Sequence, residues 1–313
     1  MAKGEPLRRL LKAQTDGSCD FPDPGRDRLL AQVLDRYGDG VMAVLIYGSY
    51  LRGKRDTLLD FYVLLDSYRT MPRRWQAWLA MALPPNVYQI QTGQPPQEVR
   101  AKFALLTLDR FERAVRKDFH SYFWARFAQP CGILYCRDEA VHERLIAAFA
   151  QSARTFVERV VPRLPDEFDA PRLWSEGLAL TYACEFRSEP QSHAETLFSH
   201  WPDHYRSITN ELAAAGLGYR PAGDGDRFRN TTTSGARRLS AIGWFVRRLQ
   251  GKLLSTLRIL KAALTFEGAL DYLLWKIRRH SGVYIAPTER QRRFPLLFAW
   301  PLLWRLWRRG AFR

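Results

Sequence analysis

The feature that most constrains the fold lies between residues 44 and 66, which read VLIYGSYLRGKRDTLLDFYVLLD. Two apolar runs, 41–48 and 57–66, have the length and composition of buried strands. A Gly-Ser pair closes the first run, and one carboxylate, Asp60, stands inside the second. An unpaired charge in a buried strand is costly, so such a carboxylate usually has a partner or a metal, and we expect magnesium that carries a nucleotide. The stretch therefore predicts a strand, a tight turn and a second strand that carries an acid.

The turn between these strands has the chemistry of a phosphate site. Gly48 lets the backbone bend tightly and lets a phosphate approach closely. Ser49 adds a hydroxyl at the expected start of a short helix, where backbone N–H groups favour anions. Asp60 follows eleven residues later on the neighbouring strand, where its carboxylate can hold Mg²⁺ together with substrate phosphates. This arrangement is similar to the Gly-Ser and Asp-x-Asp pattern of the nucleotidyltransferase superfamily.

The second acid of that pattern is absent. Residues two apart on a strand face the same side, so the second slot is position 62, which holds Tyr62. Asp66 lies on the same face, but six residues along a strand is about 20 Å, too far to share an ion. The motif alone therefore leaves open an ordinary turn, followed by an acid at a strand end that local amides cap.

The charge of the chain is concentrated at its C-terminal end. Residues 236–313 hold 17 Lys or Arg and 3 Asp or Glu, a net charge of +14. Residues 1–235 hold 31 basic and 29 acidic side chains, a net charge of +2. This asymmetry indicates a polyanionic partner, either nucleic acid or an anionic membrane surface.

Cysteine usage and hydropathy bear on the cellular compartment of the protein. The four cysteines form no CxxC pair, which is typical of reduced structural thiols in a cytosolic protein. Residues 1–17 have no apolar core of secretory length, although a short amphipathic transit peptide stays open. The longest apolar run, 294–304, has 11 residues and two prolines. A spanning helix needs about twenty apolar residues, so we do not expect this run to cross a bilayer unaided.

Helical and strand patterns in mixed order over the N-terminal half predict an α/β or α+β domain that ends near residue 140. The similarity to the nucleotidyltransferase pattern implies an α+β fold with a nucleotidyltransferase-fold mixed sheet and flanking helices. We expect the nucleotidyltransferase domain over 20–145 and a helical, winged-helix-like domain with a linker over 146–235, with the nucleotide in the cleft between them. Residues 236–313 should form basic amphipathic helices and a membrane-associating tail. Residues 218–235 are rich in Gly, Asp and Thr and have no apolar period, which predicts a linker or a mobile loop. Apolar residues then recur every three or four positions, at Ile242, Phe245, Leu249, Leu253, Leu257 and Leu260.

Several blocks resemble the mitochondrial-type phosphatidate cytidylyltransferases, the translocator-assembly-and-maintenance type of CDP-diacylglycerol synthase. IYGSY (46–50) and LDFYVLLD (59–66) are similar to that family's Tyr-Gly-Ser and Leu-Asp-Phe segments, in which an apolar residue also fills the second-acid slot. AKFALLT (101–107) resembles its Ile-Lys-Tyr-Gly strand and marks Lys102.

Three later blocks follow in the family's order, so the resemblance covers about 41–280. HSYFWARFAQPCGILY (120–135) marks Tyr122, Arg126 and Pro130. LTYACEFRSE (180–189) marks Glu185 and Arg187, with Glu185 where the family has Asp. LKAALTFEGALDYLLWKI (260–277) marks Lys261 and Thr265.

The resemblance implies a reaction in which CTP and phosphatidate give CDP-diacylglycerol and diphosphate with the help of Mg²⁺. It implies that Asp60 and Glu185 hold the metal and that Lys102 acts with them in catalysis. It assigns Gly48 and Ser49 to the triphosphate and Arg126 and Arg187 to phosphate contacts. Lys261 would meet the lipid phosphate. Each basic residue has a plainer alternative, as a solvated charge or the partner of a structural acid.

The tail suits a membrane partner. Residues 294–309 interleave three tryptophans with Phe and Leu, and Arg305, Arg308 and Arg309 stand close to them. Tryptophan favours the headgroup region, and each basic residue near an anionic surface contributes about 1 kcal/mol. We expect an interfacial anchor and a peripheral protein on the cytoplasmic side of a membrane (the matrix side of the inner mitochondrial membrane in a eukaryote). The alternative is a tail helix packed on the body or on a partner chain.

Two other functions stay open. The chain could be a nucleotidyltransferase that acts on a soluble or RNA acceptor, or a non-catalytic basic protein that binds nucleic acid. Basic residues mixed with Trp and Leu favour lipid, since a nucleic-acid arm is more often polar and rich in Gly or Ser.

Overall fold

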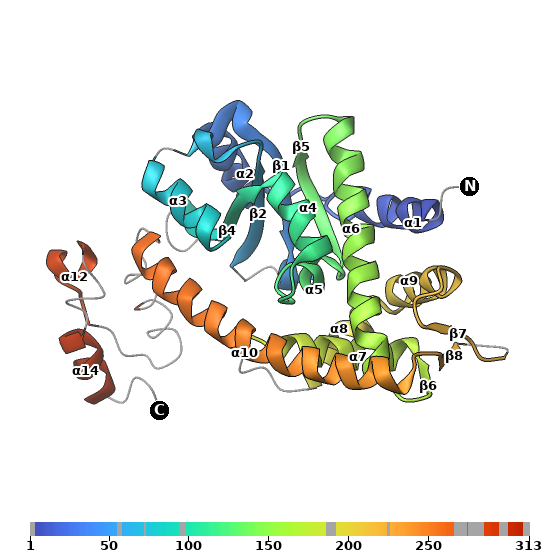
Figure 1. Ribbon diagram of the computed structural model, residues 1–313. Helices are drawn as coiled ribbons and strands as arrows, with labels where there is room; N and C mark the ends of the chain where they lie inside the picture. Colours follow the sequence, from blue (N-terminus) through green and yellow to red (C-terminus); the bar gives the residue numbers. More distant parts are fainter. Residues whose placement is uncertain are drawn as a thin grey trace.

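The structure is a computed structural model with a mixed α+β fold, in which helices flank a central five-stranded sheet (Figure 1). The sequence prediction is confirmed at this level. The structure describes residues 4–54, 58–71, 73–93, 98–185, 192–223, 226–265, 274, 285–293 and 300–308.

The central sheet has the strand order β3-β4-β2-β1-β5. Its strands are β1 (Val41–Tyr47), β2 (Leu59–Leu65), β3 (Asn86–Thr92), β4 (Val99–Thr107) and β5 (Cys131–Cys136). β2 and β4 are parallel, whereas the other neighbouring pairs are antiparallel. β1, β2 and most of β4 are buried, which explains why they appear in the sequence as continuous apolar runs.

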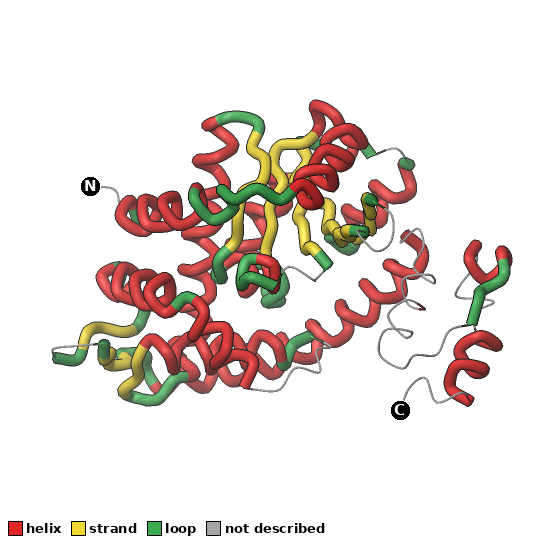
Figure 2. Tube along the Cα trace, turned by 180° about the vertical axis from the view of Figure 1, so that it is seen from behind, coloured by secondary structure: helices red, strands yellow, loops and turns green. Residues whose placement is uncertain are grey.

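Helices cover both faces of the sheet (Figure 2). α2 (Pro24–Tyr37) and α3 (Arg74–Ala82) pack on the face to which Ile46 and Phe61 point. Leu45 and Tyr62 point to the other face, where the helices are α4 (Leu108–Lys117), α5 (Trp124–Phe127) and α6 (Glu139–Val160). α2 ends next to Gly38, as its sequence predicts.

The second half of the chain is mainly helical. It contains α7 (Ala170–Tyr182), α8 (Ser192–His200) and α9 (Pro202–Ala214), and α1 (Glu5–Asp16) packs beside α6 and α9. A small antiparallel sheet joins β6 (Glu167–Asp169), β8 (Arg227–Asn230) and β7 (Tyr219–Pro221) in that order. Residues 218–235, expected as a linker or mobile loop, thus contain the strands β7 and β8, because strands of three or four residues are too short to show an alternating pattern in the sequence. The winged-helix-like character of this half stays a prediction.

The two halves share one apolar core. α6 runs without a break through residue 145, where the sequence suggests a domain boundary. Phe156 of α6 stacks on Trp174 of α7 with 4.7 Å between ring centroids. The same cluster of buried residues extends to Phe111 of α4 and Leu212 of α9, so the halves support each other's position.

A long helix, α10 (Ser234–Thr265), runs along the body and contacts both halves (Figure 1, orange). Trp244 Nε1 donates a hydrogen bond to the carbonyl of Arg159 at 3.0 Å, and Arg258 Nε donates to the carbonyl of Pro84 at 3.1 Å. In the described residues beyond α10, two short helices are α12 (Glu289–Arg293) and α14 (Trp300–Arg308). A search of the described residues for a helix of sufficient length and hydropathy to span a bilayer finds none.

The packing of α10 on the body depends on Gly251. A Cβ there would lie 2.3 Å from the backbone carbonyl of Cys184, which cannot move aside as a flexible side chain could. We expect Gly251→Ala to lower the free energy of unfolding by about 2 kcal/mol, measured by urea denaturation. Gly243→Ala is the matched control, because nothing lies within 4 Å of a Cβ at that position of the same helix. It should raise stability by up to about 1 kcal/mol; equal effects of the two substitutions would contradict this packing.

Candidate functional site

Three polar side chains form a row across neighbouring strands at one end of the central sheet. Tyr47 of β1 pairs with Asp60 of β2, and Asp60 pairs with Lys102 of β4. Alternation places all three on the face that Leu45 and Tyr62 share, beyond the part that the helices cover. Asp60 is thus the second residue of its strand, with a side chain 23% exposed, rather than an acid in the middle of a buried strand.

The Gly-Ser turn lies directly beside this row. Gly48 has φ of 86°, a conformation that favours glycine, and a Cβ there would be 3.4 Å from Asp60 Oδ2. The short helix expected after Gly48 is a single 3₁₀ turn, Gly48–Tyr50. Tyr50 is buried on the opposite face, where its hydroxyl donates to Asp23 Oδ2 at 2.6 Å. The Tyr50 ring therefore does not fill the space beside Gly48 and Ser49 in which a phosphate would bind.

Asp60 and Lys102 form an ion pair. Lys102 Nζ lies 2.9 Å from Asp60 Oδ1. Desolvation in the site opposes the charge of Lys102, but the carboxylate outweighs it and raises the pKa of this lysine above its ordinary value. The carboxylate that the sequence assigns to Mg²⁺ is thus paired with an ammonium group in the structure, and the metal stays a prediction.

The second-acid slot is occupied by a tyrosine that binds an arginine. Tyr62 lies on the same face as Asp60, as strand alternation predicts. Arg126 of α5 donates from Nη1 to the hydroxyl of Tyr62 at 2.8 Å and to that of Tyr47 at 3.4 Å. Burial raises the pKa of Tyr47 to about 12, so this hydroxyl stays protonated at neutral pH.

Tyr122 connects this site to α10. Its ring lies between two guanidinium groups, with Arg126 Cζ 4.4 Å and Arg258 Cζ 4.1 Å from its centroid. Burial opposes ionisation of the Tyr122 hydroxyl, but these two cations lower its pKa below the ordinary value for tyrosine. Arg258, which the sequence patterns did not single out, therefore belongs to the surroundings of the site.

The row, the turn and Arg126 line a cavity of about 530 Å³ between the sheet and the helical half. Glu185, three residues after α7, lines the opposite wall, and Arg126 Nη2 lies 3.8 Å from its Oε2. The other charged groups in the lining are Arg52 and Lys54, so four cations face two acids among the described residues. This balance suits an anionic ligand.

The structure brings together most of the residues that the sequence marked. Those that line the cavity are Gly48, Ser49, Asp60, Lys102, Tyr122, Arg126, Pro130 and Glu185. Arg187 lies outside the described residues, as does the side chain of Thr265. Arg52 and Lys54 were missed, although two basic residues directly after a Gly-Ser turn are a readable signal for phosphate.

Lys261, which the resemblance also marks, lies outside the cavity. Its ammonium group donates hydrogen bonds to the backbone carbonyls of Leu83 and Pro85, and its side chain is buried. Burial, with a smaller effect from the charge of Arg258, lowers the pKa of Lys261 to about 7. In this arrangement Lys261 fastens α10 to the loop after α3, and it does not line the cavity.

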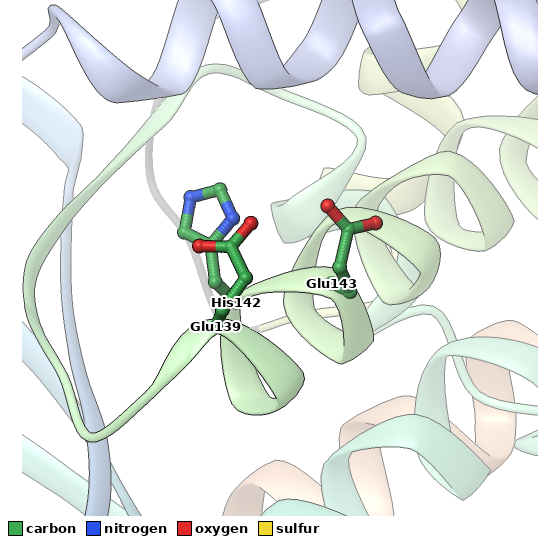
Figure 3. Close-up of side chains that lie close together, drawn as sticks. All are labelled: Glu139, His142 and Glu143. Carbon is green, nitrogen blue, oxygen red and sulfur yellow. The ribbon is translucent and has the colours of Figure 1, made fainter.

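A second group of potential metal ligands lies on the surface at the start of α6. Glu139, His142 and Glu143 offer ligand atoms within 4.8 Å of one another (Figure 3). Lys12 of α1 already lies on this group, with Nζ 2.8 Å from Glu139 Oε1 and 3.0 Å from Glu143 Oε1. The three residues could hold a metal ion, but their present role is to bind α1 to α6.

A neighbouring cavity of about 490 Å³ lies between α1, α5 and α9, and it shares the wall of Gln129, Pro130 and Trp201 with the first. His204 lines it, buried, with Nδ1 in hydrogen-bond contact with Gln14 Oε1. Burial lowers the pKa of His204 to about 4.

This histidine predicts a loss of stability in mild acid. The unfolded chain binds a proton near pH 6.5 and the folded chain only near pH 4, so stability is full above pH 6.5 and falls as pH drops toward 4. The contribution is about 3 kcal/mol. Urea denaturation at several pH values should show a shallower fall for His204→Asn, which keeps a donor nitrogen. Parallel pH profiles for the two proteins would refute the assignment.

Two comparisons with known proteins find no match. No protein-family model matches the chain, and no curated protein matches it. The resemblance to phosphatidate cytidylyltransferases therefore rests on the sequence blocks alone.

Proposed function

We propose that the chain is a phosphatidate cytidylyltransferase, which transfers the cytidylyl group of CTP to phosphatidate and releases diphosphate. The observation that carries the proposal is the cavity in which Asp60, beside the Gly48 turn, faces Lys102 and Arg126. A turn with room for a phosphate, one carboxylate and an excess of cations is what a nucleoside triphosphate requires.

The side chains present fit Mg²⁺. Asp60 Oδ1 is buried and accepts no well-formed hydrogen bond, with Lys102 as its ionic neighbour, and Glu185 offers a carboxylate from the opposite wall. Carboxylate oxygens completed by substrate phosphates are the ligands that Mg²⁺ prefers. Asp60 and Glu185 would hold the ion, which when bound supplies positive charge to the phosphates of the nucleotide.

The proposed reaction requires the protein to position the two substrates and to offset their negative charge. An oxygen of the phosphatidate phosphate forms a bond to the α-phosphorus of CTP as the bond from that phosphorus to the bridging oxygen breaks. Diphosphate leaves with the electron pair. The attacking oxygen is already anionic, so no general base is required. Lys102, whose pKa is raised, and Arg126 stay charged at neutral pH and offset the negative charge that gathers in the cavity.

The lipid substrate requires access to a membrane, and the proposed partner is the surface of an anionic bilayer. In α14, Trp304 is exposed and Arg308 Cζ lies 4.8 Å from its ring centroid. A tryptophan beside arginines is typical of an interfacial segment, which supports peripheral attachment on the cytoplasmic or matrix side. The prediction for residues 294–299 lies outside the described part of the chain.

Product identity tests the proposal. The purified full-length protein is incubated with Mg²⁺ and CTP labelled at the α-phosphate, with phosphatidate in vesicles or with RNA as the acceptor. We expect label in a lipid that migrates as CDP-diacylglycerol, and an equal release of diphosphate. Label in RNA alone would favour the other nucleotidyltransferase function. Retention of RNA without turnover of either acceptor would favour a nucleic-acid-binding protein.

A further inference from the structure

The outer face of α10 carries a stripe of exposed apolar side chains. Seven of the twelve exposed large hydrophobic residues in the described part of the chain lie on this helix, and they are 42–71% exposed. They are Leu239, Ile242, Phe245, Val246, Leu249, Leu253 and Leu257. Their spacing of three or four residues places them on one side of the helix. We call this set the α10 stripe.

The polarity of α10 is inverted relative to a helix that packs by its apolar face. Arg247 points to the body, where its Nε donates to the carbonyl of Phe119 at 2.6 Å, and Lys261 is buried against Leu83 and Pro85. Backbone carbonyls thus accept hydrogen bonds from the cations on the inner face. Trp244 is also buried there, while the seven apolar side chains of the α10 stripe lie outside. An apolar surface of this extent marks a site of interaction.

Charge identifies the kind of partner. Residues 234–265 contain seven Lys or Arg and no Asp or Glu. Arg248 and Lys252 are exposed, and helical spacing puts them, with Arg238, along one edge of the α10 stripe. An apolar face with cations along one edge, on a helix without acids, complements a surface that is apolar below and anionic above, which is the interface of an anionic bilayer.

The dimensions agree with a helix that lies in the plane of the interface. From Leu239 to Leu257 the α10 stripe is about 27 Å long. On α3, Trp75 and Trp78 are also exposed, and the loop that follows α3 is held by Arg258 and Lys261 of α10. Tryptophan side chains favour the headgroup region.

We propose that α10 docks on an anionic lipid bilayer through the α10 stripe, with Arg238, Arg248 and Lys252 at the lipid headgroups. The inference deepens the proposed function and rests on it for the identity of the lipid substrate. Arg258, on the inner face of the docked helix, stacks on Tyr122 of the cavity. The cavity therefore lies next to the membrane-bound helix, on its inner side.

Vesicle flotation of the full-length protein tests the docking. One set of vesicles contains equal parts of phosphatidylcholine and phosphatidylglycerol, and the other contains phosphatidylcholine alone. We expect the protein to bind the anionic vesicles and Ile242→Asn/Leu249→Asn/Leu253→Asn to bind them at least roughly tenfold more weakly. The replaced side chains are exposed, so circular dichroism should show an unchanged fold.

Two double variants that remove the same charge from different helices test the basic edge of the α10 stripe. Arg248→Gln/Lys252→Gln should weaken binding several-fold at low salt and should reduce its dependence on salt. Arg113→Gln/Arg116→Gln removes the same charge from exposed positions of α4 and should bind as the unaltered protein does. Equal losses for the two pairs would overturn the proposal, since any surface charge would then serve.

Two results with the triple asparagine variant would also overturn it. One is vesicle binding within twofold of the unaltered protein. The other is a dimer of the unaltered protein in sedimentation that this variant alone abolishes while vesicle binding persists, which would assign the α10 stripe to a second copy of the chain.

Rates of turnover distinguish a failure of this inference from a failure of the proposed function. If both hold, the triple asparagine variant keeps its rate with a short-chain phosphatidate in solution and loses it with phosphatidate in vesicles. If the unaltered protein makes no CDP-diacylglycerol from either form, the proposed function fails, whereas the flotation result stands without it.

Discussion

Replacing Asp60 with asparagine is expected to lower the rate of CDP-diacylglycerol formation roughly a thousandfold. Asparagine keeps the shape of the side chain but removes the charge that pairs with Lys102 at 2.9 Å and that would bind the metal. The initial rate with labelled CTP and phosphatidate measures the effect. Loss of the ion pair should cost only about 1 kcal/mol of stability, because both side chains are partly exposed.

Asp66→Asn is the matched control for this substitution. Asp66 directly follows the same strand, is exposed and lies outside the cavity lining. Its replacement should leave the rate within about twofold, in keeping with a surface change. A rate for Asp60→Asn within tenfold of the unaltered protein would remove this acid from the catalytic site and with it the proposed mechanism.

Replacing Arg126 with methionine is expected to impair both folding and activity. The Arg126 side chain is only 12% exposed, and it donates to Tyr62, stacks on Tyr122 and faces Glu185. Its loss strands buried polar groups, so the free energy of unfolding should fall by about 3 kcal/mol in urea denaturation. Activity should fall roughly a hundredfold or more, since the cavity loses a fixed cation.

Arg126→Lys distinguishes charge from geometry at this position. Lysine keeps the positive charge but lacks the planar fork that reaches two tyrosine hydroxyls and stacks on a third ring. We expect an intermediate rate and an intermediate stability. Arg113→Met, at an exposed position of α4, should change stability by no more than about 0.5 kcal/mol. Similar losses for Arg113→Met and Arg126→Met would mean that the cavity has no special need of Arg126.

The parts of the site that depend on local chemistry were predictable from the sequence. Gly48 at a tight turn and Tyr62 on the face of Asp60 follow from glycine conformation and strand alternation, and the structure confirms both. The ion pair of Asp60 with Lys102 depends instead on which strands become neighbours. Those residues are 42 positions apart, and no local pattern states that β2 and β4 pair in parallel.

The orientation of α10 on the body could not be predicted from the sequence. The periodicity of 242–260 predicts a helix with an apolar and a basic side, and the structure has a helix there that extends over Ser234–Thr265. Periodicity does not say which side meets the body. The burial of Arg247 and Lys261 against backbone carbonyls decides it, and those carbonyls belong to Phe119, Leu83 and Pro85, which are remote in the sequence. Arg258 was missed for the same reason.

The alignment of Tyr47, Asp60 and Lys102 across three strands has a consequence for how this protein can change in evolution. A slip of one residue in either strand pairing would turn an acid or a cation to the opposite face and separate the three groups. Insertions in the connection between the Gly48 turn and Leu59 leave the alignment intact, whereas a single insertion within β2 would dismantle it. Arg52 and Lys54 of that connection line the cavity, so an insertion there would spare the row of three side chains but displace cations of the lining.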